Sequence, residues 1–162
     1  MGVAEQVDGR AAFGDFVALV EQRLRRALVA AYGAEVGREA TADALAWAWQ
    51  HWDRVQGMAN PAGYLWRVGQ TSARRLGQAR RREVSSGAIE VDLASSARDR
   101  DVEPRLAHAM ADLSDQQRAA VLLVHGYSYT LAEAGEVLGC SVSTIRNHVA
   151  RALRRLRAAL EV

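Results

Sequence analysis

The side chains with the clearest chemical potential lie between Ser141 and Arg155. This segment repeats Arg, Asn and Ser at helical spacing, and no acidic residue lies between Ser141 and Leu160. Arg and Asn form paired hydrogen bonds with guanine and adenine edges in the major groove, and Ser contacts either strand more weakly. The residues expected to contact DNA from this segment are Ser143, Thr144, Arg146, Asn147, His148, Arg151 and Arg155.

Two helices joined by a tight turn would position this basic face. Thr130 and Glu133 form a T-x-x-E capping box, which predicts the start of the first helix, and Gly139 suits its left-handed end. Ser141 is expected to cap the second helix, whose apolar residues recur every three or four positions and predict a buried stripe. The pattern is typical of a helix-turn-helix. The alternative is a helical hairpin with a solvated basic face.

A second basic segment runs from residue 60 to residue 82. Asn60 and Pro61 predict a helix start, with Asn as the cap and Pro at the first helical position. The three consecutive arginines 80–82 exceed what the helix dipole needs, which favours a surface that faces phosphates. All four Trp lie between residues 47 and 66. They are interpreted mainly as core residues, with a pocket for unpaired bases as the alternative.

The 162 residues divide by charge and periodicity. Residues 11–82 and 104–162 show helical spacing and carry more Arg than acids, whereas residues 83–103 are acidic, Ser-rich and aperiodic. We therefore predict an all-α protein of two small helical domains, 11–82 and 104–162, joined by a flexible acidic linker at 83–103. Residues 53–60 are expected to form a loop within the first domain.

Several function classes are disfavoured by what the chain contains. The four His lack metal-binding spacing, and no phosphate-binding loop or nucleophile motif occurs, so we expect no enzyme, no metal and no cofactor. The single Cys140 excludes an internal disulfide and fits a reducing compartment. No signal peptide or run of 18 apolar residues occurs, which predicts a cytoplasmic protein without membrane insertion.

Residues 113–160 resemble region 4 of the extracytoplasmic-function group of bacterial RNA polymerase sigma factors. Residues 60–82, preceded by a helix that ends in WAWQHW, resemble region 2 of the same group. The resemblance implies a region 2 helix bundle and a region 4 helix-turn-helix. It also implies binding to core RNA polymerase, promoter recognition and transcription initiation, with an anti-sigma factor as a common further partner. Such a protein would work on the bacterial nucleoid through polymerase.

The resemblance also implies roles for particular residues. The helix at 141–155 would read the −35 element, and the second helix, 35–52, would contact core polymerase through Arg38, Glu39, Ala42 and Asp43. The −10 element would be captured and opened by residues of 53–82, namely Arg54, Gln56, Met58, Asn60, Arg67, Thr71, Arg74, Arg75, Arg80, Arg81 and Arg82.

The chain departs from the family pattern at three places. Residues 39–43 keep the acids of the usual D-L-V-Q-E segment but lack its Gln and bulky apolar residues, and Thr71 replaces a common Asn. Gly135 replaces a usual Ala, which is expected to weaken its helix by about 0.5–1 kcal/mol. The alternatives are a stand-alone helix-turn-helix regulator, although residues 1–82 lack the α/β pattern of a receiver domain, and a sigma-like decoy without polymerase binding.

Overall fold

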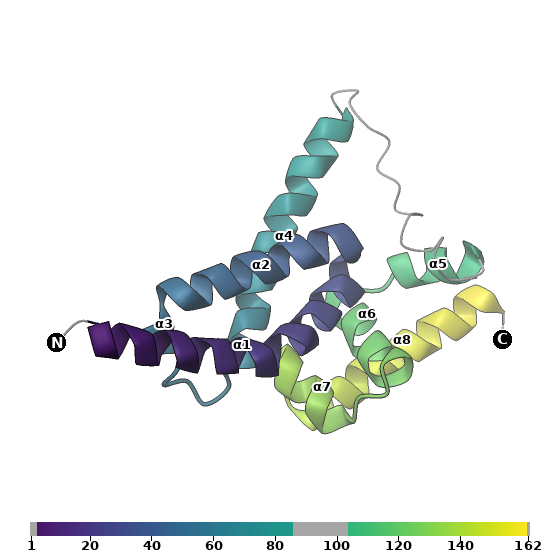
Figure 1. The fold of residues 1–162 in the computed structure, drawn as a ribbon. Coiled ribbons are helices and arrows are strands. Elements are labelled where there is room, and N and C mark those ends of the chain that lie inside the picture. Colours follow the sequence, from purple (N-terminus) through teal and green to yellow (C-terminus); the bar gives the residue numbers. More distant parts are fainter. Residues whose placement is uncertain (1–2, 86–103, 162) are drawn as a thin grey trace.

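The computed structural model describes residues 3–85 and 104–161, and every regular element within these ranges is helical (Figure 1). The N-terminal segment contains α1 (Val3–Tyr32), α2 (Ala34–Gln50), α3 (Trp52–Val55) and α4 (Pro61–Ser85). The C-terminal segment contains α5 (Pro104–Ala111), α6 (Asp115–Val121), the π-helix η1 (Leu122–Gly126), α7 (Leu131–Leu138) and α8 (Val142–Leu160). The predicted all-α fold is confirmed for the described residues.

Several element limits differ from those expected. Helix α1 begins at Val3, and its N-terminal end extends past the bundle (Figure 1). The expected loop at 53–60 is shorter, because Trp52–Val55 form a helical turn. Helix α4 continues to Ser85 and takes up the start of the expected linker. The rest of that linker, 86–103, lies outside the described residues.

Helices α1, α2 and α4 pack closely because small residues occupy their contacts. A Cβ added at Gly37 would lie 2.5 Å from the backbone of Val29, so α1 and α2 meet backbone to backbone. At Gly69 of α4 the Leu28 side chain occupies the space of the absent Cβ, with its Cδ1 2.6 Å from the position that a Cβ would take. Trp66 is fully buried in the core, as the interpretation of the Trp residues as core predicts for this one.

The expected helix caps are present in the C-terminal segment. Thr130 and Glu133 form the capping box of α7, and Ser114 forms another with Gln117 at α6. Gly139 ends α7 in the left-handed conformation, with φ 64°. Ser141 Oγ accepts a hydrogen bond from Thr144 N at 3.2 Å and caps α8. These local signals set the angle between α7 and α8.

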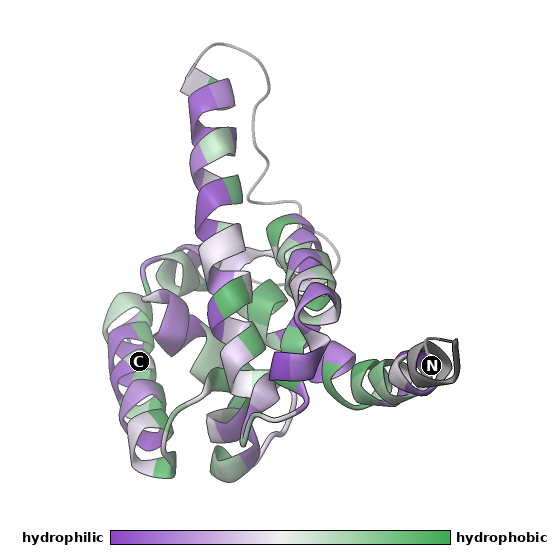
Figure 2. Ribbon diagram, turned by 90° about the vertical axis from the view of Figure 1, so that its left-hand side faces the viewer, coloured by the Kyte–Doolittle hydropathy of each residue, from purple (hydrophilic) through white to green (hydrophobic). Residues whose placement is uncertain are grey.

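The two segments share one hydrophobic core. Helix α1 packs against α6, η1 and α7, and α4 packs against α7. The largest cluster of buried apolar residues joins Leu24 and Leu65 of the N-terminal segment to Leu123 and Val137 of the C-terminal segment. In Figure 2 the end of α4 that projects from the bundle is mostly hydrophilic, with a few hydrophobic positions along it.

Candidate nucleic-acid interface

Helix α8 presents its polar face to solvent. Ile145 and Val149 are buried against the rest of the C-terminal segment. On the other side Ser143, Arg146, Asn147, Arg151 and Arg155 are exposed, and Thr144 and His148 are half-buried. Among the described residues, no carboxylate forms an ion pair with Arg146 or Arg151. The side chains expected to read bases are therefore exposed on this face of α8.

The turn between α7 and α8 depends on Gly135. A Cβ at this position would lie 2.7 Å from the carbonyl oxygen of Cys140, and Cys140 N donates to Gly135 O at 2.9 Å. A side chain would push the turn away from α7. The expected helix-propensity cost of Gly135 stays a prediction, and the absent Cβ has a further effect, because it permits the close approach of the turn to α7.

Helix α4 carries basic residues along most of its exposed side. Arg67, Thr71, Arg74 and Arg75 are exposed. Near the C-terminal end, Arg81 and Arg82 border an open hollow together with Gln78 and Ser85. The spacing predicted this surface, and the structure keeps Arg81 and Arg82 where a phosphate backbone can reach them.

Two of the arginines expected to contact DNA phosphates form ion pairs with acidic side chains of α2. Arg80 lies 2.7 Å from Glu35 and 3.6 Å from Glu39, and Arg75 lies 3.6 Å from Asp43. Ser72 also donates to Asp43. Of the residues expected to contact polymerase, Arg38 and Ala42 are exposed, whereas Glu39 and Asp43 have these partners within the chain. The proposed polymerase-binding surface of α2 and the basic surface of α4 are therefore in contact, which the sequence analysis did not predict.

Aromatic residues form a partly exposed shelf beside the 56–60 loop. Trp47 stacks on His51 with ring centroids 4.2 Å apart and lies 5.3 Å from Tyr64. The guanidinium of Arg54 lies 5.7 Å from the Tyr64 ring centre. Sequence analysis did not select His51 or Tyr64; the four-residue spacing from Trp47 to His51 was the available signal. Around the shelf, Gln56 is exposed, and Met58 and Asn60 are half-buried.

A crevice of about 250 Å³ is lined by residues of α4 and of the C-terminal segment. Arg67 borders it from one side, and Thr144 and His148 of α8 border it from the other. Trp66 Nε1 and Gln116 Oε1 are buried without a hydrogen-bond partner in the described part of the chain, and both residues line this crevice. Residues expected to read different promoter elements therefore face one another.

Burial and the nearby charge of Arg151 lower the pKa of His148. In the unfolded chain a histidine titrates near pH 6.5, so as the pH falls His148 is protonated in the unfolded state before it is protonated in the folded state. The free energy of unfolding therefore decreases as the pH falls from about 6.5 through the lower pKa of the folded state. We expect His148→Gln to reduce the loss of unfolding free energy between about pH 7.5 and pH 5. Urea unfolding at both pH values measures this. The exposed His125 provides the control, and an equal loss in His148→Gln and the parent chain would contradict the assignment.

Within the described ranges, no group of His, Cys, Asp and Glu side chains is arranged to hold a metal ion. None of the helices there has the length and apolar character needed to cross a membrane.

Comparison with known proteins identifies the C-terminal segment. Residues 109–158 match the family model for sigma-70, region 4. A similar solved structure is the sigma factor RpoE in complex with the anti-sigma factor NepR from Bartonella quintana. It is 25% identical, with a TM-score of 0.59, and the match covers 93% of this chain and 98% of that one.

A second similar structure is CnrH in complex with the cytosolic domain of CnrY. It is 24% identical, with a TM-score of 0.56, and the match covers 94% of this chain and 89% of the other. No curated protein sequence matches significantly. The region 4 match, together with the likeness to RpoE over nearly the whole chain, supports the resemblance of this chain to the extracytoplasmic-function group of the sigma-70 family.

Proposed function

We propose that this sigma factor binds core RNA polymerase and directs it to promoters, reading the −35 element with α8 and the −10 element with residues 53–82. The observation that carries the proposal is the exposed, acid-free face of α8, centred on Arg146 and Asn147, within the region 4 match. The domain limits 11–82 and 104–162 belong to the same proposal.

Duplex reading by α8 is supported by its geometry. A helix that enters the major groove contacts base edges with residues of its first turns. Arg146 and Asn147 lie in the second turn of α8, directly after the Ser141 cap and the tight turn that follows α7. The buried stripe of Ile145 and Val149 holds this part of α8 against the C-terminal segment, so the face that carries Arg146 and Asn147 is fixed in orientation.

Capture of an unpaired −10 base is supported by the aromatic shelf. Unstacking a base costs a few kcal/mol, and stacking on an aromatic ring returns about 1–3 kcal/mol per base. Trp47 and Tyr64 offer ring surface beside the loop, and Arg54 adds positive charge there. Arg67 and Thr71, exposed on α4, would hold the adjoining backbone.

Two protein partners follow from the proposal. Core polymerase would dock on α2 at Arg38, Glu39, Ala42 and Asp43. The RpoE structure contains the anti-sigma factor NepR. We propose an anti-sigma factor as a partner of this chain also, because its fold resembles RpoE over nearly its whole length.

Co-elution with bacterial core RNA polymerase in gel filtration tests the function. We expect the full chain to elute with polymerase and to support runoff transcription from a promoter found by selection. Arg38→Ala/Ala42→Arg should abolish co-elution, because it changes the surface of α2 that would dock on polymerase. Both positions are exposed, so the change should leave the hydrophobic core of the protein intact. A chain that elutes apart from polymerase at micromolar concentration would contradict the proposal.

A sigma-like decoy is the second candidate. The observation that favours it is that Glu39 and Asp43 already pair with Arg80 and Arg75. Exposed ion pairs contribute only about 0–1 kcal/mol, so their exchange for polymerase contacts would cost little. DNA binding by a chain that does not co-elute with polymerase would support the decoy, or a stand-alone regulator.

The salt dependence of DNA binding should separate the arginines of α4. Removing one phosphate contact lowers the slope of log affinity against log salt by about 0.9, so Arg81→Ala/Arg82→Ala is expected to lower it by about 2. Arg80→Ala should change it less, because Glu35 and Glu39 hold this guanidinium. Fluorescence anisotropy on a random-sequence duplex measures the slope. Arg105→Ala, at an exposed position of α5, is the control, and an unchanged slope in the double variant would remove the phosphate assignment.

A further inference from the structure

Val142, the first residue of α8, carries an exposed apolar side chain. It is 40% exposed, and it belongs to neither of the two clusters of buried apolar residues in the described part of the chain. The other large apolar side chains that the structure shows exposed, Leu19, Trp49 and Val84, all belong to the N-terminal segment. Single exposed apolar residues are common on protein surfaces, so what distinguishes Val142 is its surroundings.

Val142 lies on the face of α8 that carries the residues proposed to read bases. Residues four positions apart on a helix are neighbours, so Val142 adjoins Arg146, and Ser143 adjoins Asn147 in the next row. All four side chains are exposed. A duplex that covers Arg146 and Asn147 would therefore cover Val142 as well.

The polar side chains of the first turn already have partners within the chain. Ser141 Oγ lies 3.0 Å from Ser143 Oγ and 2.8 Å from Thr144 Oγ1, and it accepts a hydrogen bond from Thr144 N. These hydroxyl groups hold one another and the cap in place. Val142 lies among them and can form no hydrogen bond through its side chain, so a partner for it must be apolar.

We infer that Val142 reads the 5-methyl group of a thymine near the guanine that Arg146 contacts. The inference rests on the proposed function, in which α8 enters the major groove. The thymine methyl is the apolar group that bases present there, beside hydrogen-bond donors and acceptors. Covering it buries apolar surface, whereas covering the amino group of cytosine or adenine removes water that valine cannot replace. The upstream element should therefore contain a T·A pair at this position.

The geometry of α8 limits where the thymine lies. Four residues of an α-helix span about 6 Å, and successive base pairs are about 3.4 Å apart. The distance from Val142 to Arg146 along the helix therefore corresponds to about two base pairs at most. We expect the thymine within this distance of the guanine, on the side of the N-terminal end of α8.

Replacing thymine with uracil in the DNA tests the contact, because uracil pairs in the same way and lacks only the methyl group. The element is selected with the full chain and core RNA polymerase, and each thymine of either strand is then replaced in turn. We expect one replacement near the guanine to weaken binding about fourfold, the effect of one buried methyl group. In Val142→Ala, whose shortened side chain no longer reaches the base, the same replacement should have almost no effect.

Val84→Ala is the matched control. Val84 lies near the end of α4 and is 41% exposed, against 40% for Val142. Both substitutions shorten an exposed helical valine, so their effects on helix propensity are similar. Val84→Ala should keep the full sensitivity of the parent chain to uracil. Circular dichroism and co-elution with polymerase check that both variants fold and bind.

Cytosine and 5-methylcytosine provide the reverse test. When a C·G pair replaces the T·A pair with the cytosine in the place of the thymine, a 5-methyl group returns the apolar contact without restoring the thymine. We expect the parent chain to bind the methylated duplex about fourfold more tightly than the unmethylated one. Val142→Ala should bind both with equal affinity.

Three results would overturn the inference: an element without thymine at this position, a parent chain insensitive to uracil, or a Val142→Ala chain as sensitive as the parent. If Arg146→Ala still relaxes the preference for a guanine, α8 reads bases as proposed and only the role of Val142 fails. If the selection yields no preferred upstream sequence, the proposed reading by α8 and the role of Val142 both fail.

Discussion

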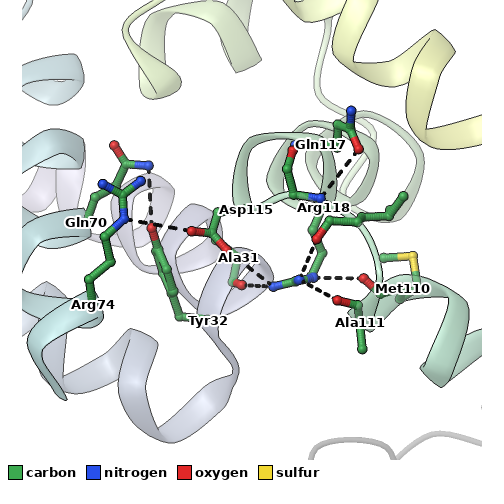
Figure 3. Close-up of polar contacts among 11 residues, drawn as sticks. Ala31, Tyr32, Gln70, Arg74, Met110, Ala111, Asp115, Gln117 and Arg118 are labelled. Atoms are coloured by element: carbon green, nitrogen blue, oxygen red, sulfur yellow. Dashed lines mark hydrogen bonds and ion pairs between the residues drawn. The ribbon is translucent and has the colours of Figure 1, made fainter. Parts of the chain in front are cut away.

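Replacing Arg118 with alanine is expected to lower the unfolding free energy by about 2–4 kcal/mol, the largest stability loss of any single arginine change. The guanidinium satisfies four backbone carbonyls, those of Ala31, Met110, Ala111 and Leu113 (Figure 3), and its side chain is only 21% exposed. Without it, carbonyls at the ends of α1 and α5 lose a charged donor, and the contact between α1 and α6 loosens. Urea unfolding followed by circular dichroism measures the change.

Two variants separate this effect from a general loss of charge. Arg105→Ala removes an exposed arginine of α5 and should stay within about 0.5 kcal/mol of the parent chain. Arg118→Lys keeps the charge but loses the planar arrangement of donors, so it should recover only part of the stability. An Arg118→Ala chain as stable as Arg105→Ala would show that the carbonyl network contributes nothing.

Replacing Arg146 or Asn147 with alanine is expected to relax sequence preference at one upstream position each. A good bidentate contact discriminates against the wrong base by about 1–3 kcal/mol, roughly fivefold to 150-fold in affinity. Both side chains are exposed on α8, so truncation should not disturb the core. The preference is measured by selecting bound duplexes from a random library with the full chain in the presence of core RNA polymerase.

Arg157→Ala is the matched control, because this residue is exposed near the far end of the same helix. It should weaken binding to all duplexes by a similar small factor and leave the selected sequence unchanged. If Arg146→Ala and Asn147→Ala also leave the selected sequence unchanged, α8 does not read bases in the proposed way.

The sequence determined the local architecture of the helix-turn-helix segment. The boxes at Thr130 and Ser114 join residues three positions apart, and the left-handed Gly139 ends α7 where the spacing predicted. Capping signals act between residues within one helical turn, so they can be predicted from one amino-acid sequence. The same holds for the exposed face of α8, because helical periodicity alone separates it from the buried stripe.

Only the tertiary structure decided what covers each face. Arg80 meets Glu35 across 45 positions, and Arg118 meets Ala31 across 87. Helical periodicity does not predict that Gly63 and Gly139 are neighbours. It also does not predict that Gly135 lies against the Cys140 carbonyl, where a side chain would collide. Helical spacing tells which side of an element is buried; the partner on that side is chosen by the packing of distant segments, which leaves no local pattern in the sequence.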